Sequence, residues 1–161
     1  APLFPVTFDM VPATCHFKTV LPDAKVEIGG EGAVLTSLPL NHPGSATGYR
    51  LDHQSKSFCY ITDHEHADDF DPTALVGFVN DTDLMVFDTM FMPSDMDSHK
   101  GWGHSSWQHA VDVATKASVK KLALFHTSPD YYDDQLLAIE EEARKNFKGT
   151  FLAREGSGIE L

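Results

Sequence analysis

Two short apolar runs, each followed by an amphipathic helical pattern, constrain the fold of this chain most. DLMVFD at 83–88 and KKLALFH at 120–126 have the length and continuous apolar character of buried strands. Residues 104–118 and 133–147 instead repeat their apolar positions at helical spacing. Strands that alternate with helices predict an α/β sheet covered by helices on at least one face. With 161 residues, 42% of them apolar, the chain is expected to form one domain over 1–161.

The first sixty residues have the pattern of strands separated by turns. β-Branched and apolar residues gather at 15–20, 25–28 and 33–40. Two further runs, 49–53 and 57–62, are joined by a polar turn, which is the signature of a hairpin. This half of the chain is therefore expected to add strands to the sheet.

Smaller signals indicate where the other elements begin and end. A short helix is expected from Pro72, and Ser105 has the spacing of an N-cap residue for the helix that follows it. Gly149 is expected to close the last long helix. Two short strands, at 151–155 and 158–161, then complete the prediction.

Three residues suited to metal binding fall where predicted strands end. His42 follows the run at 33–40, Asp63 follows the hairpin, and His126 ends the second buried run. Loops beyond strand ends are where α/β sheets gather their ligands. Imidazole and carboxylate groups are ordinary ligands of divalent metals, although a single histidine near a strand end is more often an ordinary surface residue.

The order of the motifs resembles the later half of a metallo-β-lactamase-fold hydrolase, nearest the ribonuclease Z and phosphodiesterase-like branch. The match extends over residues 33–161. The segments that carry it are NHPGSATGYRLD (41–52), KSFCYITD (56–63), TDLMVFDTMF (82–91), GHSSWQHAVDVATKASVKKLALFH (103–126) and FLAREGSGIEL (151–161). The resemblance implies an αββα sandwich, present as its C-terminal portion, with a mixed sheet and flanking helices.

The same resemblance implies a site with two metal ions. His42 and His126 match metal-binding histidines, and Asp63 matches the carboxylate that bridges the ions. The cofactors expected are two divalent ions, with zinc favoured and manganese or iron as alternatives. A water shared by two such ions loses a proton near neutral pH and attacks the substrate.

His104 and Asp88 match a proton-donating pair of the ribonuclease Z branch. In that interpretation His104 stands near the leaving group, and Asp88 orients it and favours its charged form. In the alternative interpretation, His104 begins a helix and Asp88 merely ends a strand. Both remain open from the sequence.

The string CYITDHEHADD at 59–69 contains two histidines and four acids. His64, His66, Asp68 and Asp69 imitate the family's H-x-H-x-D-H metal motif. That motif precedes H-P-G-S in the family, whereas this string follows it, so the imitation is interpreted as accidental. Within this string, Asp63 alone is expected to be a metal ligand. Glu65 and His66 are candidates for shaping the surroundings of the ligands or for contacting substrate. A separate metal site in the string is the less favoured alternative.

One departure from the family matters most, because no H-x-H-x-D-H precedes residue 33. We therefore expect the chain to be part of a larger domain and to bind metal weakly and hydrolyse little by itself. An apolar sheet face would be left uncovered. A longer gene product is the favoured source of the missing half; a second chain or a second copy of this chain are the alternatives.

Charge limits the partners. The chain has 12 Lys and Arg against 24 Asp and Glu, a formal charge of −12, which disfavours nucleic acid and favours a small substrate. Cys15 and Cys59 form no closely spaced pair, which suggests a reducing compartment. Without an apolar run of membrane length or a basic leader, a cytoplasmic location and no membrane contact are expected.

Two functions follow as hypotheses. The favoured one is a metal-dependent hydrolase of a phosphodiester or related ester. The alternative is a non-catalytic binding or assembly module on a degenerate scaffold of the same fold. In either case the polar loop at 93–103, flanked by Met92, is a candidate for the mouth of a substrate site or a plain surface turn.

Overall fold

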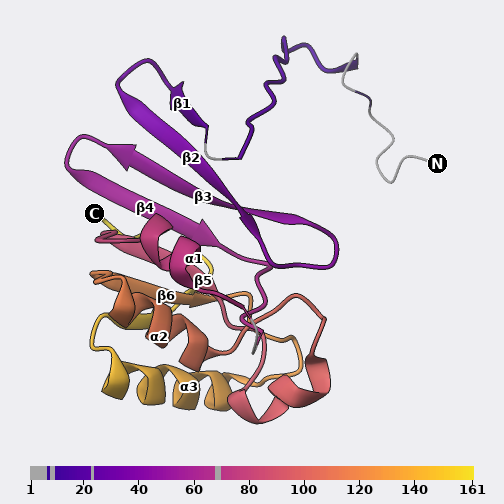
Figure 1. Ribbon diagram of the computed structural model, residues 1–161, viewed down its shortest axis with the longest axis vertical. Coiled ribbons are helices and arrows are strands. Elements are labelled where there is room, and N and C mark those ends of the chain that lie inside the picture. Colours follow the sequence, from indigo (N-terminus) through magenta and orange to yellow (C-terminus); the bar gives the residue numbers. More distant parts are fainter. Residues whose placement is uncertain (1–6, 8–9, 23, 68–69) are drawn as a thin grey trace.

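The computed structural model describes residues 7, 10–22, 24–67 and 70–161, which form one seven-stranded mixed sheet with helices (Figure 1). The strands lie in the sheet in chain order, from β1 to β7. The elements are β1 (Lys25–Ile28), β2 (Ala33–Leu40), β3 (Ala46–His53), β4 (Lys56–Ile61), α1 (Thr73–Phe78), β5 (Leu84–Asp88), the 3-10 helix η2 (Pro93–His99), α2 (Trp107–Lys116), β6 (Lys121–Phe125), α3 (Asp133–Asn146) and β7 (Thr150–Leu152). The predicted α/β class is confirmed.

Strand direction brings the C-terminal ends of five strands to one edge of the sheet. Strands β1 to β4 pair antiparallel, and β4 to β7 pair parallel. Strand β2 is two antiparallel steps from β4, so it runs in the same direction as β4, β5, β6 and β7. The C-terminal ends of these five strands therefore share an edge.

The three α-helices cover one face of the sheet, where the core lies. Strands β4, β5 and β6 contribute Ile61, Phe87 and Leu122, all 0% exposed, and α2 contributes Ala110 and Val113, which are also 0% exposed. Burial of these apolar side chains is the main favourable contribution to folding. None of the helices formed by the described residues has the length and apolar character that a membrane span requires.

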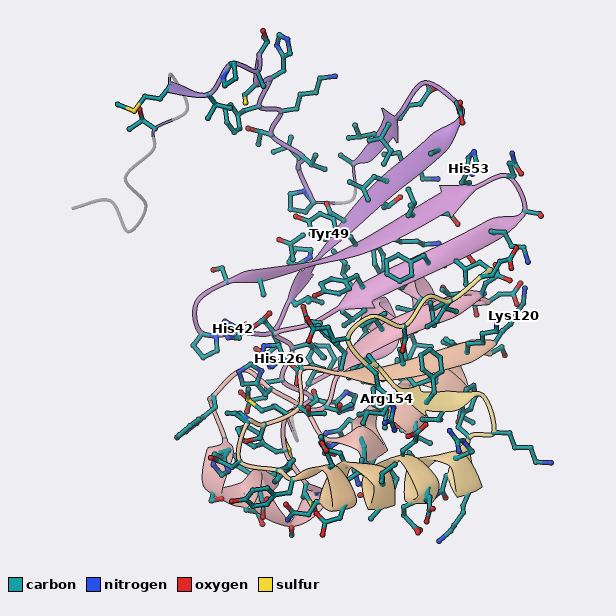
Figure 2. The ribbon with its side chains drawn as sticks, turned by 180° about the vertical axis from the view of Figure 1, so that it is seen from behind. His42, Tyr49, His53, Lys120, His126 and Arg154 are labelled. Atoms are coloured by element: carbon teal, nitrogen blue, oxygen red, sulfur yellow. The ribbon has the colours of Figure 1, made fainter. Side chains whose placement is uncertain are left out.

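The opposite face carries exposed aromatic side chains (Figure 2). Tyr49, Tyr60 and Phe125 on β3, β4 and β6 are 40%, 37% and 38% exposed. The ring centroids of Tyr60 and Phe125 are 5.9 Å apart. The segment after β7 runs back along this face, where Glu160 O accepts a hydrogen bond from Lys121 Nζ at 3.2 Å. We call Tyr49, Tyr60 and Phe125 the aromatic face.

The structure corrects the two outermost predicted strands. Residues 15–20 form no strand; their side chains are almost all exposed, so they lack the burial that stabilises a strand. Residues 158–161 also form no strand. The polar loop at 93–103 contains the helix η2.

Of the three helix ends assigned to single residues, the start at Pro72 agrees with its place as the N-cap of α1, and the other two are wrong. Ser106, not Ser105, is the N-cap of α2, in a capping box with His109. The Ser105 hydroxyl does not cap the helix; it donates a hydrogen bond to His64 O at 2.5 Å. Helix α3 ends at Asn146 with Phe147 as its C-cap. Gly149 instead allows close approach to Lys120 O, from which an added Cβ would lie 2.5 Å away.

Candidate metal centre

The shared edge of the sheet brings together His42, Asp63 and His126, the three residues predicted as metal ligands. They follow β2, β4 and β6 respectively. His126 Nε2 lies 3.5 Å from Asp63 Oδ1. Figure 2 shows His42 and His126 at this edge, whereas His53 lies at the opposite end of the sheet.

His104 and Asp88 complete the cluster. Donor atoms of His42, Asp63 and His104 lie within 4.8 Å of one another, as do donor atoms of Asp88, His104 and His126. His104 Nδ1 is 2.8 Å from Asp88 Oδ2. The predicted contact between these two side chains is therefore present, while the catalytic role assigned to it stays a prediction.

Asp88 connects three segments of the site. Its side chain is fully buried and accepts hydrogen bonds from the backbone N–H groups of Asp63 at 2.9 Å, Ser105 at 3.2 Å and Met90 at 3.2 Å. These bonds come in addition to the contact with His104. The position of Asp63 thus depends on the same carboxylate that orients His104.

Asp63 and His126 have left-handed backbone conformations, with φ of 60° and 57°. Non-glycine residues adopt such angles at a cost of about 1–3 kcal/mol each, and they concentrate at functional sites. The hydrogen bond from Asp63 N–H to Asp88 stabilises one of these two residues. Gln54, Asp81 and Ser118, which lie away from the site, have similar angles, so these conformations by themselves do not mark the site.

The histidines of the string at 59–69 do not join this cluster. His64 is 1% exposed and packs against Phe70 and Phe87, with ring centroids 4.9 and 5.9 Å away. Burial lowers the pKa of His64 to about 3, so its ring is neutral. The ring of His66 stacks on His109 at 4.8 Å. Asp68 and Asp69 lie outside the described residues.

Glu65 forms hydrogen bonds to the loop that precedes His104. It is 6% exposed, and its carboxylate accepts hydrogen bonds from the N–H groups of Gly101 at 2.7 Å and Gly103 at 2.9 Å. Gly103, at φ 90°, is so close to the His42 ring that an added Cβ would lie 2.1 Å from His42 Cδ2. The sequence offered Glu65 only as a neighbour of Asp63, and no local pattern indicated that it binds a loop 36 residues away.

Replacing Glu65 by glutamine is expected to loosen the loop. A glutamine side chain has one acceptor oxygen, so one of the two backbone N–H groups would face an NH₂ group. We expect a loss of about 1–3 kcal/mol in the free energy of unfolding and faster amide exchange at Gly101 and Gly103. Urea titration and hydrogen exchange measure the two effects.

Glu142→Gln is the matched control. Glu142 is exposed and pairs with Lys145 at 2.7 Å, and loss of such a pair costs about 0–1 kcal/mol. Unchanged exchange at Gly101 and Gly103 in Glu65→Gln would contradict the role given to Glu65.

A hollow of about 520 Å³ lies between the loop after β4, η2 and the start of α2, and none of the five residues of the cluster lines it. Its lining includes Glu65, His66, Met96, Lys100 and His109. Met96 and Lys100 of the loop at 93–103 thus line a hollow, whereas the expectation that this loop forms the mouth of the substrate site stays a prediction.

Comparison with known proteins decides the family. A model described as a β-lactamase superfamily domain matches residues 3–127. The chain belongs to this superfamily. The resemblance drawn from the sequence is thereby confirmed, and the superfamily includes curated relatives named ribonuclease Z.

Two of these relatives show how much of the superfamily domain is present. Ribonuclease Z of Gemmatimonas aurantiaca is 37% identical over 81 residues, which are 50% of this chain and 26% of that protein. Ribonuclease Z of Parabacteroides distasonis is 30% identical over 131 residues, 81% of this chain and 38% of that protein. The chain thus spans well under half the length of these relatives.

Solved structures of the superfamily share the fold. The metallo-β-lactamase fold protein YhfI from Bacillus subtilis superposes with a TM-score of 0.71 at 23% identity, over 87% of this chain and 54% of that one. The short form of human tRNase Z gives 0.56 at 19% identity, over 76% and 40%. Zn²⁺-bound PqqB from Methylobacterium extorquens gives 0.67 at 13% identity, over 89% and 55%.

The donor set fits the divalent metals suggested by these superfamily neighbours. Two ligands bound at about 2.1 Å in a tetrahedral site lie about 3.4 Å apart, close to the 3.5 Å between His126 Nε2 and Asp63 Oδ1. Imidazole nitrogen and carboxylate oxygen are both zinc ligands. His42 fits less simply, because its Nδ1 already accepts the Gly44 N–H at 3.0 Å.

Proposed function

We propose that this chain forms part of a metal-dependent hydrolase that cleaves a phosphodiester or a related ester. The observation that carries the proposal is the convergence of His42, Asp63 and His126 from three separate strand ends. The short distance between Asp63 Oδ1 and His126 Nε2 supports their use as ligands of the same centre. In the full-length protein we expect two divalent ions, with zinc favoured and manganese or iron as alternatives.

The residues of the chain would divide the chemistry between them. Bound divalent ions supply an activated water and polarise the scissile group. His42, Asp63 and His126 would hold these ions in place. Asp88 would orient the His104 ring through the 2.8 Å contact between Oδ2 and Nδ1, and a proton on Nε2 would then pass to the leaving oxygen.

The aromatic face supports the presence of a further partner. Tyr49, Tyr60 and Phe125 are each more than a third exposed, and contiguous apolar surface of this kind marks an interface. The occupant that we propose is the other half of the superfamily domain, carrying the H-x-H-x-D-H ligands. The partial coverage of YhfI and of the ribonucleases Z supports this assignment; a second copy of this chain is the alternative occupant.

A small substrate suits the charge of the chain better than a nucleic acid does. The formal charge of −12 repels a phosphate backbone. The relatives are nevertheless named ribonuclease Z, so a small diester and an RNA should be tested side by side.

The experiment uses the full-length gene product and bis(p-nitrophenyl) phosphate. Chelation is expected to abolish hydrolysis, and zinc or manganese is expected to restore it, with elemental analysis giving two ions per active site. Hydrolysis that survives complete removal of metal would contradict the proposal. Lack of both metal and activity would favour the non-catalytic module instead.

A further inference from the structure

Trp102 is an exposed indole close to the candidate metal centre. It precedes His104 by two residues, and the next residue, Gly103, is so near the His42 ring that no Cβ would fit between them. Consecutive Cα atoms are about 3.8 Å apart, so the backbone of Trp102 is also near His42. Tryptophan is highly buried on average, yet Trp102 is 60% exposed. An explanation is therefore needed for a large apolar ring left open at this place.

The backbone that carries the indole is held by three consecutive N–H groups. Gly101 and Gly103 donate to the Glu65 carboxylate at 2.7 and 2.9 Å, and between them Trp102 donates to His99 O at 3.1 Å. Glu65 is only 6% exposed, so its two bonds are shielded from water. The indole thus projects from a backbone segment that is fixed on both sides.

A series of aromatic contacts orients the indole relative to His104. Its ring is edge-on to that of His99, with centroids 4.7 Å apart and planes at 80°. His99 stacks on Phe91 at 4.1 Å and 23°, and Phe91 lies 6.0 Å from the His104 ring. Edge-to-face and stacked pairs of this kind are favourable. Trp102 is therefore positioned by its neighbours while most of its own surface stays free for a ligand.

The place of Trp102 in the fold distinguishes it from the aromatic face. The aromatic face lies on the sheet itself, whereas Trp102 lies in a loop beyond the strand ends, where α/β sheets bind their ligands. A neutral ring contact also supplies affinity without cationic side chains, of which this chain of formal charge −12 has few. Both points favour a substrate group as the occupant of the exposed indole.

We propose that Trp102 stacks on a planar aromatic group of the substrate, either a plain aryl ring or a nucleobase. This inference rests on the proposed function and adds a substrate class to it, an ester or diester that carries an aromatic ring close to the scissile bond. Stacking on an aromatic side chain tolerates different rings, because every such ring has a π-face. Trp102 is thus a residue that determines specificity and takes no part in the chemical step.

The test measures competitive inhibition of bis(p-nitrophenyl) phosphate hydrolysis by the metal-loaded full-length protein. Phenylphosphonate against methylphosphonate tests a plain aryl ring, and thymidine 5′-monophosphate against 2-deoxyribose 5-phosphate tests a nucleobase. We call the ratio of inhibition constants within a pair the ring preference. It cancels changes at the metal centre, because both members of a pair carry the same phosphorus group. The wild type should show a ring preference of about tenfold in at least one pair.

Three substitutions of Trp102 separate the ring from its bulk. Trp102→Ala and Trp102→Leu should each reduce the ring preference to about twofold or less, because neither side chain has a π-face. Trp102→Phe should keep most of it. Phe17→Ala is the matched control, since Phe17 is 76% exposed in the segment before β1 (Figure 1); its ring preference should equal that of the wild type. Circular dichroism shows whether each variant has folded.

A direct readout does not depend on turnover. The indole N–H resonance of Trp102, assigned by its loss in Trp102→Phe, should shift on saturation with the preferred ring-bearing compound and stay in place with its ringless partner. A resonance unmoved by both phenylphosphonate and thymidine 5′-monophosphate would overturn the inference.

The outcomes separate this inference from the proposed function. Metal-dependent hydrolysis without a ring preference in the wild type, or with a full ring preference in Trp102→Ala and Trp102→Leu, would overturn the inference and leave the proposed function intact. A metal-loaded wild type that hydrolyses nothing would contradict the proposed function, and the Trp102 resonance would then decide the inference by itself.

Discussion

Replacing Asp63 by asparagine in the full-length protein is expected to lower hydrolysis of bis(p-nitrophenyl) phosphate about a thousandfold. Asparagine keeps the size of the side chain but removes the charge that would hold the metal ions. Metal ions contribute several kcal/mol to stabilising the transition state. At 1.36 kcal/mol per factor of ten, a loss of about 4 kcal/mol corresponds to this thousandfold decrease in kcat/KM.

Steady-state kinetics at saturating zinc, with the metal content measured in parallel, would check this result. The control is Asp112→Asn on α2, since Asp112 is solvent-exposed and pairs with Lys116 one turn away. Its kcat/KM should match that of the wild type. Wild-type turnover in Asp63→Asn would show that Asp63 is not part of the active site.

Replacing Asp88 by alanine should have the largest effect on stability. The substitution leaves three backbone N–H groups without their acceptor, those of Asp63, Met90 and Ser105. Each buried group without a partner costs about 1–3 kcal/mol, so with three such groups we expect the free energy of unfolding to fall by about 3 kcal/mol or more. Asp63 should also lose the bond that supports its left-handed conformation.

Urea-induced unfolding followed by circular dichroism measures the loss. Asp112→Ala serves as the control, with an expected change of about 0.5 kcal/mol or less, as for an exposed i,i+4 pair. A loss below about 1 kcal/mol in Asp88→Ala would show that water satisfies the freed groups. Asp88 would then orient His104 without supporting the site as a whole.

The helices and inner strands were predictable because their signals are local. The apolar runs at 83–88 and 120–126 became β5 and β6, and the amphipathic patterns became α2 and α3. The outer segments at 15–20 and 158–161 failed as strands. The side chains of these segments are not buried, so strand pairing would gain little stability there. β-Propensity without burial is a weak determinant of structure.

The sequence by itself determined which metal-binding side chains follow a strand, and His42, Asp63 and His126 were identified in this way. Strand direction in the folded sheet then placed them on one edge, because β2, β4 and β6 run in the same direction. Only the tertiary structure decided what holds them there. Glu65 reaches a loop 36 residues away, and Ser105 bonds a carbonyl 41 residues away. Such contacts depend on how separate loops pack against each other, which no local pattern of apolar and polar residues encodes.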